Sequence, residues 1–119
     1  MEERLPRKTD KPWGYELLFA LTPKYAGKQI YIKKNQRLSL QYHSKKDESM
    51  FIYQGKVLME IEVLGDQSKR ITLEPGQCVH ISPFTKHRLQ AIEDTILFEV
   101  STPELDDVTR LADDYGRVG

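Results

Sequence analysis

Four side chains that can bind a metal ion recur along the sequence: Gln41, His43, Glu48 and, 39 residues later, His87. Two imidazole nitrogens, a carboxylate oxygen and an amide oxygen suit borderline divalent ions such as Zn, Mn, Fe, Co or Ni. An ion that keeps coordination sites open for a substrate acts as a Lewis acid. The pattern therefore predicts one divalent metal ion as the cofactor.

Residues 37–43 read as a strand that presents two of these ligands together. Successive side chains of a strand point to opposite faces. One predicted face carries Arg37, Ser39, Gln41 and His43, and the other carries Leu38, Leu40 and Tyr42. Glu48 opens the next strand and His87 opens a late one, so a closed barrel is expected to bring the four ligands together.

Short apolar runs with period-two alternation recur along the chain, separated by turn residues. They predict strands at Tyr15–Leu21, Lys28–Lys33, Arg37–His43, Ser49–Tyr53, Lys56–Val63, Lys69–Leu73, Cys78–Ile81, His87–Ile92 and Ile96–Ser101. So many short strands favour an all-β antiparallel barrel or sandwich. We expect an N-terminal arm at 1–14, the barrel at 15–101 and a tail at 102–119, with a turn or two of helix at Glu104–Leu111.

The 119 residues suffice for one domain with a core and are too few for two. The 18 basic and 18 acidic residues cancel, which argues against nucleic acid or an anionic membrane as a partner. The start lacks the apolar stretch of a signal peptide, and no apolar run approaches the roughly 18 residues of a membrane span. The single cysteine, Cys78, fits a reducing compartment, and its alternating apolar run predicts burial. Together these features predict a soluble cytoplasmic domain.

Two longer patterns resemble the motifs of the cupin family. The first is Asn35-x5-Gln41-x-His43-x4-Glu48-x6-Gly55, with Asn35 in the place of glycine and Gln41 in the place of a histidine. The second is Gly76-x5-Ser82-x-Phe84-x2-His87-x3-Ala91, with Ser82, Phe84 and Ala91 in the places of proline, glycine and asparagine. This resemblance implies a double-stranded β-helix, also called a jelly-roll barrel.

Further segments resemble the cupin domain of type II mannose-6-phosphate isomerases, the C-terminal part of enzymes that also carry a guanylyltransferase domain. They are Lys11-Pro12-Trp13-Gly14, Gln36-Arg37-Leu38-Ser39-Leu40-Gln41, His87-Arg88-Leu89 and Asp113-Asp114-Tyr115-Gly116-Arg117. The resemblance implies that Gln41, His43, Glu48 and His87 hold the metal, and that the reaction is aldose–ketose isomerisation through a metal-stabilised enediolate. This chain departs from the family at Ser44-Lys45 and Ser49-Met50, where more histidines and a His-Trp pair are usual. Phe84 in the place of glycine is expected to put a bulky ring at the pocket mouth.

Isomerisation also needs a general base and, for a phosphorylated substrate, a phosphate site. Glu99 and His80, each flanked by apolar residues in a predicted strand, are the candidate bases. The candidates for phosphate are Arg37, which shares the predicted ligand face, Lys86 and Arg88. The arginine that matches Arg88 is tied to activity in the family, so Arg88 is also a catalytic candidate. Each of these residues has a solvated surface position as its alternative, and Lys33-Lys34 and Lys45-Lys46 are interpreted as solvated turns.

Three functions stay open on this reading: a metal-dependent isomerase of a sugar phosphate or nucleotide-linked sugar, an iron-dependent cupin oxygenase, and a non-catalytic sugar-binding or regulatory cupin. The oxygenase is included because two histidines and one carboxylate also describe a facial iron triad. The apolar row Leu38, Leu40 and Tyr42 would point out of the barrel and need cover. We therefore expect a homodimer, with the arm around Trp13 as the other possible cover.

Overall fold

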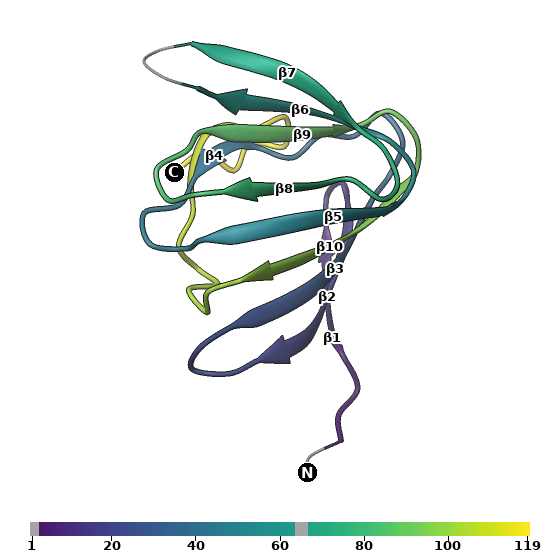
Figure 1. Ribbon diagram of the computed structural model, residues 1–119, viewed down its shortest axis with the longest axis vertical. Helices are drawn as coiled ribbons and strands as arrows, with labels where there is room; N and C mark the ends of the chain where they lie inside the picture. Colours follow the sequence, from purple (N-terminus) through teal and green to yellow (C-terminus); the bar gives the residue numbers. More distant parts are fainter. Residues whose placement is uncertain (1–2, 64–66) are drawn as a thin grey trace.

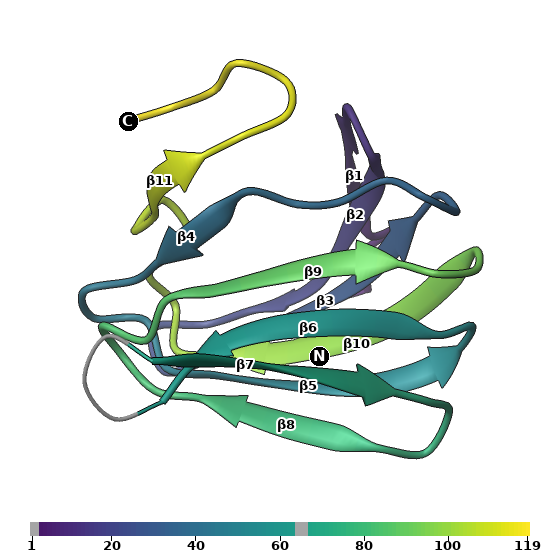
Figure 2. The same cartoon turned by 90° about the horizontal axis from the view of Figure 1, so that it is seen from above.

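The structure is a computed structural model that describes residues 3–63 and 67–119, and its strands form two antiparallel sheets that face each other (Figure 1). The first sheet contains β1 (Arg7–Lys11), β2 (Gly14–Leu21), β3 (Ala26–Ile32), β10 (Thr95–Ser101), β5 (Glu48–Gln54) and β8 (Cys78–Ile81), in that spatial order. The second contains β11 (Thr109–Ala112), β4 (Leu40–Tyr42), β9 (His87–Ala91), β6 (Val57–Glu62) and β7 (Ser68–Leu73). Seen from above, β4 and β11 lie at one side of the molecule, near the C-terminal segment (Figure 2).

Alternating burial explains why these segments are strands. In β10 the side chains of Leu97 and Glu99 are buried while Val100 points to solvent, and in β9 Leu89 is buried on the same face as His87. The inner faces of the two sheets meet in a core of aliphatic, methionine and tryptophan side chains: Trp13, Ile30, Ile32, Met50, Ile52, Val57, Met59, Leu73, Ile81, Leu89, Ala91 and Leu97. All nine predicted strands are present, with shifted ends, so the all-β prediction is confirmed.

The ends of the chain differ from expectation. Arg7–Lys11 pairs with β2 as the outermost strand of the first sheet, and Thr109–Ala112 pairs with β4 at the edge of the second. The helix expected at Glu104–Leu111 is wrong: turns lead directly into β11. Within residues 3–63 and 67–119 there is no helix that is long and apolar enough to cross a membrane.

The segment 37–43 is less regular than predicted. Only Leu40–Tyr42 forms a strand, and Arg37 makes an isolated bridge to Gln90. Bridged residues share a face of the sheet, so Arg37 lies with Gln90 on the outer face. Leu38 packs against the core, and the prediction that it points out of the barrel is wrong.

The edge strand β8 also corrects a prediction. Cys78 and His80 alternate with Val79 and Ile81, and it is Ile81 that enters the core. Cys78 is therefore exposed, and the prediction that it is buried is wrong.

Two turns depend on left-handed backbone. Gly55 has φ of 91°, and a Cβ atom there would lie 2.3 Å from the carbonyl oxygen of Asp94. Asn35, in the place of the glycine of the first motif, has φ of 68°, and its N–H donates to the carbonyl of Ala91. Asparagine tolerates this region better than most residues with a side chain.

Candidate metal centre

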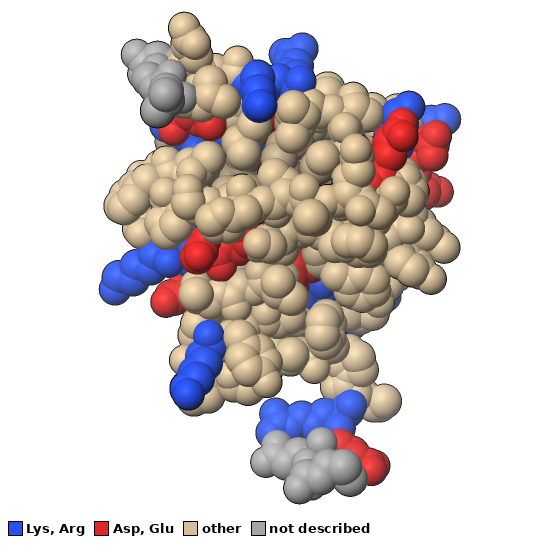
Figure 3. All heavy atoms as spheres, in the orientation of Figure 1, with Lys and Arg blue, Asp and Glu red and all other residues tan. Residues whose placement is uncertain are grey.

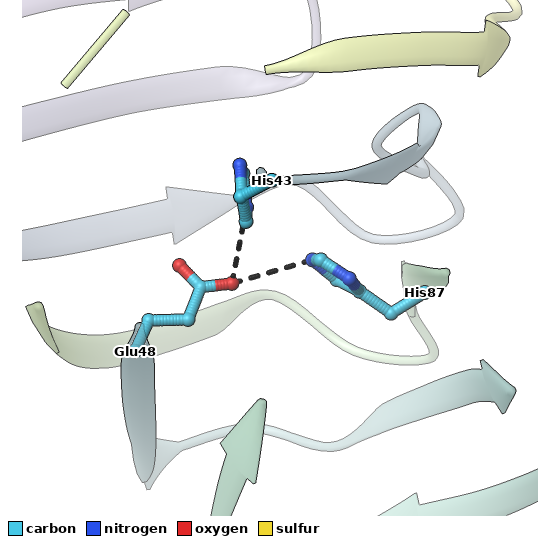
Figure 4. Close-up of side chains that lie close together, drawn as sticks. All are labelled: His43, Glu48 and His87. Carbon is cyan, nitrogen blue, oxygen red and sulfur yellow. Dashed lines mark ion pairs between the residues drawn. The ribbon is translucent and has the colours of Figure 1, made fainter. Parts of the chain in front are cut away.

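Three of the four predicted ligands converge between the two sheets. His43 follows β4, Glu48 opens β5 and His87 opens β9, and all three are buried. The Oε1 atom of Glu48 lies 3.3 Å from Nε2 of His43 and 3.3 Å from Nε2 of His87 (Figure 4). The ligand atoms of the three residues all lie within 4.8 Å of one another, which is the spacing of groups that share one ion.

Backbone carbonyl groups orient both imidazoles. His43 Nδ1 donates to the carbonyl oxygen of Asp107 at 2.6 Å, and His87 Nδ1 donates to that of Thr85 at 2.9 Å. A carbonyl can only accept, so the proton of each neutral ring resides on Nδ1. Each Nε2 atom therefore presents its lone pair to the carboxylate of Glu48, as ring nitrogens do when their other nitrogen is held by an outer partner.

This arrangement fits a cation. Two lone pairs face an anionic oxygen, and that contact is repulsive unless positive charge lies between them. Within the described part of the chain, Nε2 of His43, Nε2 of His87 and both carboxylate oxygens of Glu48 are buried without a hydrogen-bond partner of acceptable geometry. Buried polar atoms left in this state are rare in folded proteins. A divalent ion that accepts nitrogen and oxygen ligands would satisfy them.

Gln41 lies next to these three residues. It is the direct cross-strand partner of His87 and lines the same pocket as His43. Its Oε1 atom accepts a hydrogen bond from the hydroxyl of Ser39 at 2.7 Å. We carry Gln41 forward as a proposed fourth ligand beside His43, Glu48 and His87.

A buried lysine, which the sequence did not reveal, adjoins the ligands. Lys46 was interpreted as a solvated turn, but it is 5% exposed. Its Nζ atom lies 3.0 Å from Oε2 of Glu99 and 3.1 Å from Oε2 of Glu48. Burial lowers the pKa of Lys46, but the two carboxylates outweigh it and raise the pKa above its usual range.

The two carboxylates around Lys46 are shifted in opposite directions. Burial and the negative charge of Glu48 raise the pKa of Glu99 to about 7, while the positive charge of Lys46 opposes this rise. Burial acts likewise on Glu48, but its close contacts with His43 and His87, with the charge of Lys46, hold its pKa well below the usual range. Carboxyl groups set apart in this way suit different roles, a permanent anion and a proton acceptor near neutral pH. Glu99 lines the pocket beside His43, so its predicted alternative of a solvated outer face is wrong.

The other predicted site residues lie elsewhere. Arg37, Lys86 and Arg88 are on the outer side of the second sheet, where Arg37 forms a bidentate pair with Asp114 at 2.6 and 2.8 Å and Lys86 lies 3.8 Å from Glu62. The guanidinium of Arg88 donates to the carbonyls of Leu38 and Ala112, 2.9 and 3.1 Å away, and so holds β9 to the segments on its β4 side. The prediction that Arg37 lies on the same strand face as Gln41 and His43 is wrong. These three cations are not placed to reach a substrate at the ligand cluster.

Two further expectations fail for a similar reason. His80 points outward from β8, is exposed, and pairs with Asp47 instead of lining the pocket. Phe84 keeps the left-handed backbone of the glycine that it replaces, with φ of 63°, but its ring is 66% exposed and stacks on Tyr42 at 6.1 Å. The ring is not among the residues that line the pocket beside His43.

Comparisons with known proteins agree with the fold. Residues 1–113 match the family described as mannose-6-phosphate isomerase C-terminal. A mannose-1-phosphate guanylyltransferase of Escherichia coli (strain K12) is 34% identical over 122 residues, which cover 98% of this chain but 24% of that protein. The chain thus spans about a quarter of the length of this curated relative.

Solved structures show the same architecture. KdgF from Halomonas sp. superposes with a TM-score of 0.74 at 20% identity, over 84% of this chain and 90% of that one. An oxalate decarboxylase of Bacillus subtilis gives a TM-score of 0.80 at 16% identity, over 89% of this chain and 30% of that one. The identities are low, so these likenesses show the fold alone. The match over residues 1–113 shows the family: the chain belongs to the cupin family of mannose-6-phosphate isomerase C-terminal domains.

Proposed function

We propose that this domain is a metal-dependent isomerase that interconverts an aldose phosphate and a ketose phosphate of the mannose 6-phosphate type. The observation that carries the proposal is the buried cluster of His43, Glu48 and His87 beside a pocket that His43 lines together with Glu99, whose pKa is raised to about 7. Membership of the mannose-6-phosphate isomerase C-terminal family supports the choice of substrate.

The chemistry required is the transfer of a proton between neighbouring carbons. In our proposal Glu99 takes the proton from carbon 2 of the aldose and delivers it to carbon 1, while the hydroxyl proton of O2 passes to O1. A base works best when its pKa is near the working pH. Lys46 holds Glu99 and Glu48 in fixed positions, with Nζ 3.0 and 3.1 Å from their carboxylates.

His43, Glu48 and His87, with Gln41 as the proposed fourth ligand, would hold one divalent ion of the Zn, Mn, Fe, Co or Ni group. When bound, such an ion supplies positive charge that stabilises the oxyanion developing on the substrate. The ligand residues themselves keep the site in order, because His43 and His87 are fixed by carbonyl groups of Asp107 and Thr85.

The test is turnover by purified protein loaded separately with each of these ions, followed by NMR of mannose 6-phosphate converting to fructose 6-phosphate. We expect activity with at least one ion. The Glu99→Gln variant should lose about 100- to 10,000-fold in kcat while keeping its metal. The matched control Glu93→Gln, at an exposed position, should keep the kcat and the metal content of the wild type. No turnover with any ion, or full activity of Glu99→Gln, would contradict the proposal.

The same donor set favours one other chemistry enough to be tested alongside. Two histidines and a carboxylate also form the facial triad of non-haem iron oxygenases. Oxygen uptake by the ferrous protein, absent with zinc, would identify the oxygenase. Binding of sugar without turnover or oxygen uptake would identify the non-catalytic sugar-binding or regulatory cupin.

We also propose a homodimer, on a different surface from the one expected. Phe51 and Tyr53 are 43% and 54% exposed on β5, and Phe98 of β10 packs edge-on to Tyr53 at 5.7 Å. Figure 3 shows mainly residues other than Lys, Arg, Asp and Glu over the middle of one face of the molecule, with a few acidic and basic groups among them. Exposed apolar surface of this kind marks interaction sites. Sedimentation at micromolar concentration should give a dimer that Tyr53→Lys disrupts. A cytoplasmic location stays a prediction from the sequence.

A further inference from the structure

One row of cross-strand partners runs from the edge of the second sheet to the ligand cluster. Arg110 of β11 is paired with Gln41 of β4, and Gln41 is paired with His87 of β9. Side chains of directly paired residues lie on the same face of a sheet. Arg110 therefore projects on the face that carries Gln41 and His87, two strand spacings or roughly 10 Å from the latter.

Among the residues that the structure describes, no carboxylate pairs with Arg110. It lines the same pocket as Gln41, His43 and Lys46, and its Nε atom is buried. Within residues 3–63 and 67–119 its guanidinium makes no hydrogen bond or ion pair, while its backbone pairs with β4 and bonds to Gly119. Removing a charged group from water without compensation is unfavourable. A bound anion would compensate it.

The pocket around Arg110 carries an excess of positive charge. Five cations line it, Lys11, Lys28, Lys46, Arg110 and Arg117, against two carboxylates, Glu16 and Glu99. The chain as a whole is neutral, with 18 residues of each sign, so this excess is local. The β1–β2 hairpin and the C-terminal segment that supply most of these cations lie on the same side of the molecule in Figure 2.

Most of these cations already have partners. Arg117 donates to the carboxylate of Asp113 at 2.9 and 3.0 Å, and Lys28 lies 3.3 Å from Glu16. Lys46 is held by the carboxylates of Glu48 and Glu99. Of the two arginines that line the pocket, Arg110 is thus the one whose guanidinium is not already paired with a carboxylate. A planar guanidinium can donate two parallel hydrogen bonds to two oxygens of a phosphate group.

We infer that Arg110 binds the phosphate of the substrate, while the reacting end of the sugar lies at the cluster of His43, Glu48 and His87. This inference rests on the proposed function for the identity of the sugar. It assigns the substrate class as a sugar with a phosphate at the end remote from the reacting carbons. It also moves the phosphate site from the outer-face residues Arg37, Lys86 and Arg88 to the inner face of β11.

Calorimetric titration of the metal-loaded protein with mannose 6-phosphate and with mannose tests the inference without turnover. The wild type should bind the phosphorylated sugar more tightly. Arg110→Gln should weaken the affinity for mannose 6-phosphate by about 10- to 100-fold and leave the affinity for mannose unchanged, because only the charge-assisted contact is lost. The control Arg70→Gln, on the exposed strand β7, should behave as the wild type. Arg110→Lys, which keeps the stem and charge, should retain part of the preference.

Equal binding of the two sugars by the wild type would overturn the inference. So would an Arg110→Gln variant that keeps its metal content and thermal midpoint and still prefers the phosphorylated sugar as strongly as the wild type. The inference and the proposed function fail separately. Phosphate-dependent binding through Arg110 without isomerisation would contradict the proposed isomerase activity alone. Isomerisation with an unchanged KM in Arg110→Gln would contradict the proposed phosphate site alone.

Discussion

One ammonium group, that of Lys46, joins the carboxylates of Glu99 and Glu48 at 3.0 and 3.1 Å inside the barrel. It contacts Oε2 of Glu48, while Oε1 of the same residue faces His43 and His87. The two oxygens of Glu48 are thus divided between the lysine and the ligand cluster. This division connects the base proposed for catalysis to the ligands proposed for the metal.

Replacing Lys46 should be strongly destabilising. Lys46→Met leaves Glu48 and Glu99 buried without their cation, and breaking a buried charge pair costs about 3–5 kcal/mol. Lys45→Met, at the exposed neighbouring position, should change the free energy of unfolding by less than about 0.5 kcal/mol. Urea denaturation of the metal-free proteins measures both. Equal stability of the two variants would show that the buried ion pairs do not stabilise the fold.

Metal content should distinguish the buried His87, a predicted ligand, from the exposed His80, a predicted base. His87→Ala removes a ligand and should weaken metal binding by more than the roughly 10- to 100-fold found for outer partners of ligands. His80→Ala is the matched control, because His80 is exposed and paired with Asp47. Elemental analysis and competition with a chelator give the affinities. Retention of a full equivalent of metal by His87→Ala at low free metal would argue against the cluster.

Asp107 should make stability depend on pH. Its carboxylate accepts hydrogen bonds from the N–H groups of Lys45, Lys46 and Ser44 at 2.6, 2.9 and 3.1 Å, and these hold its pKa below the usual value. The folded pKa is lowered, so the stabilisation is present above the unfolded value of about 3.9 and is lost as the pH falls below it. Asp107→Ala should therefore destabilise by about 1–2 kcal/mol at pH 7 and by less at pH 3.

The control for this variant is Asp106→Ala, since Asp106 is exposed beside it. Thermal unfolding at both pH values measures the difference. A difference in stability between Asp107→Ala and the wild type that is larger at pH 3 than at pH 7 would contradict the prediction.

A pair of glycines with the same backbone tests the role of close packing at a turn. Gly55 and Gly76 have φ of 91° and 90°, but only at Gly55 would an added Cβ collide, 2.3 Å from the carbonyl of Asp94. Gly76→Ala should cost about 1 kcal/mol of backbone strain, and Gly55→Ala about 3 kcal/mol or more because the backbone must also shift. Chemical denaturation compares the two. Equal losses would mean that the turn before β6 relaxes freely.

The sequence was informative where one face of a strand is buried. Leu97 and Glu99 alternate with less buried neighbours, as do Leu89 and His87, so period-two patterning located these strands. It failed at β1, whose residues Arg7–Lys11 are mostly exposed on both faces, and at β11, where turn residues gave a false helical signal. Hydrogen bonds to a neighbouring strand hold these segments, and composition does not report such bonds.

The convergence of His43, Glu48 and His87 could be predicted, and little else of the candidate site. His43, Glu48 and His87 could be identified by spacing because the motif fixes their places on strands. Lys46 could not, because it lies in a loop where alternation carries no information about burial. Arg37 was assigned to the wrong face because the chain leaves the strand between its bridge to Gln90 and Leu40, which breaks the alternation.

The outer partners of the two ligand imidazoles are neutral carbonyl oxygens of Asp107 and Thr85, not acids. A neutral acceptor fixes the ring tautomer but withdraws little of the N–H proton, so the rings stay weaker electron donors than rings paired with a carboxylate. Any cation seated there keeps more of its electrophilic character. In this protein the main tuning of that character falls to Glu48 and to the lysine that shares it.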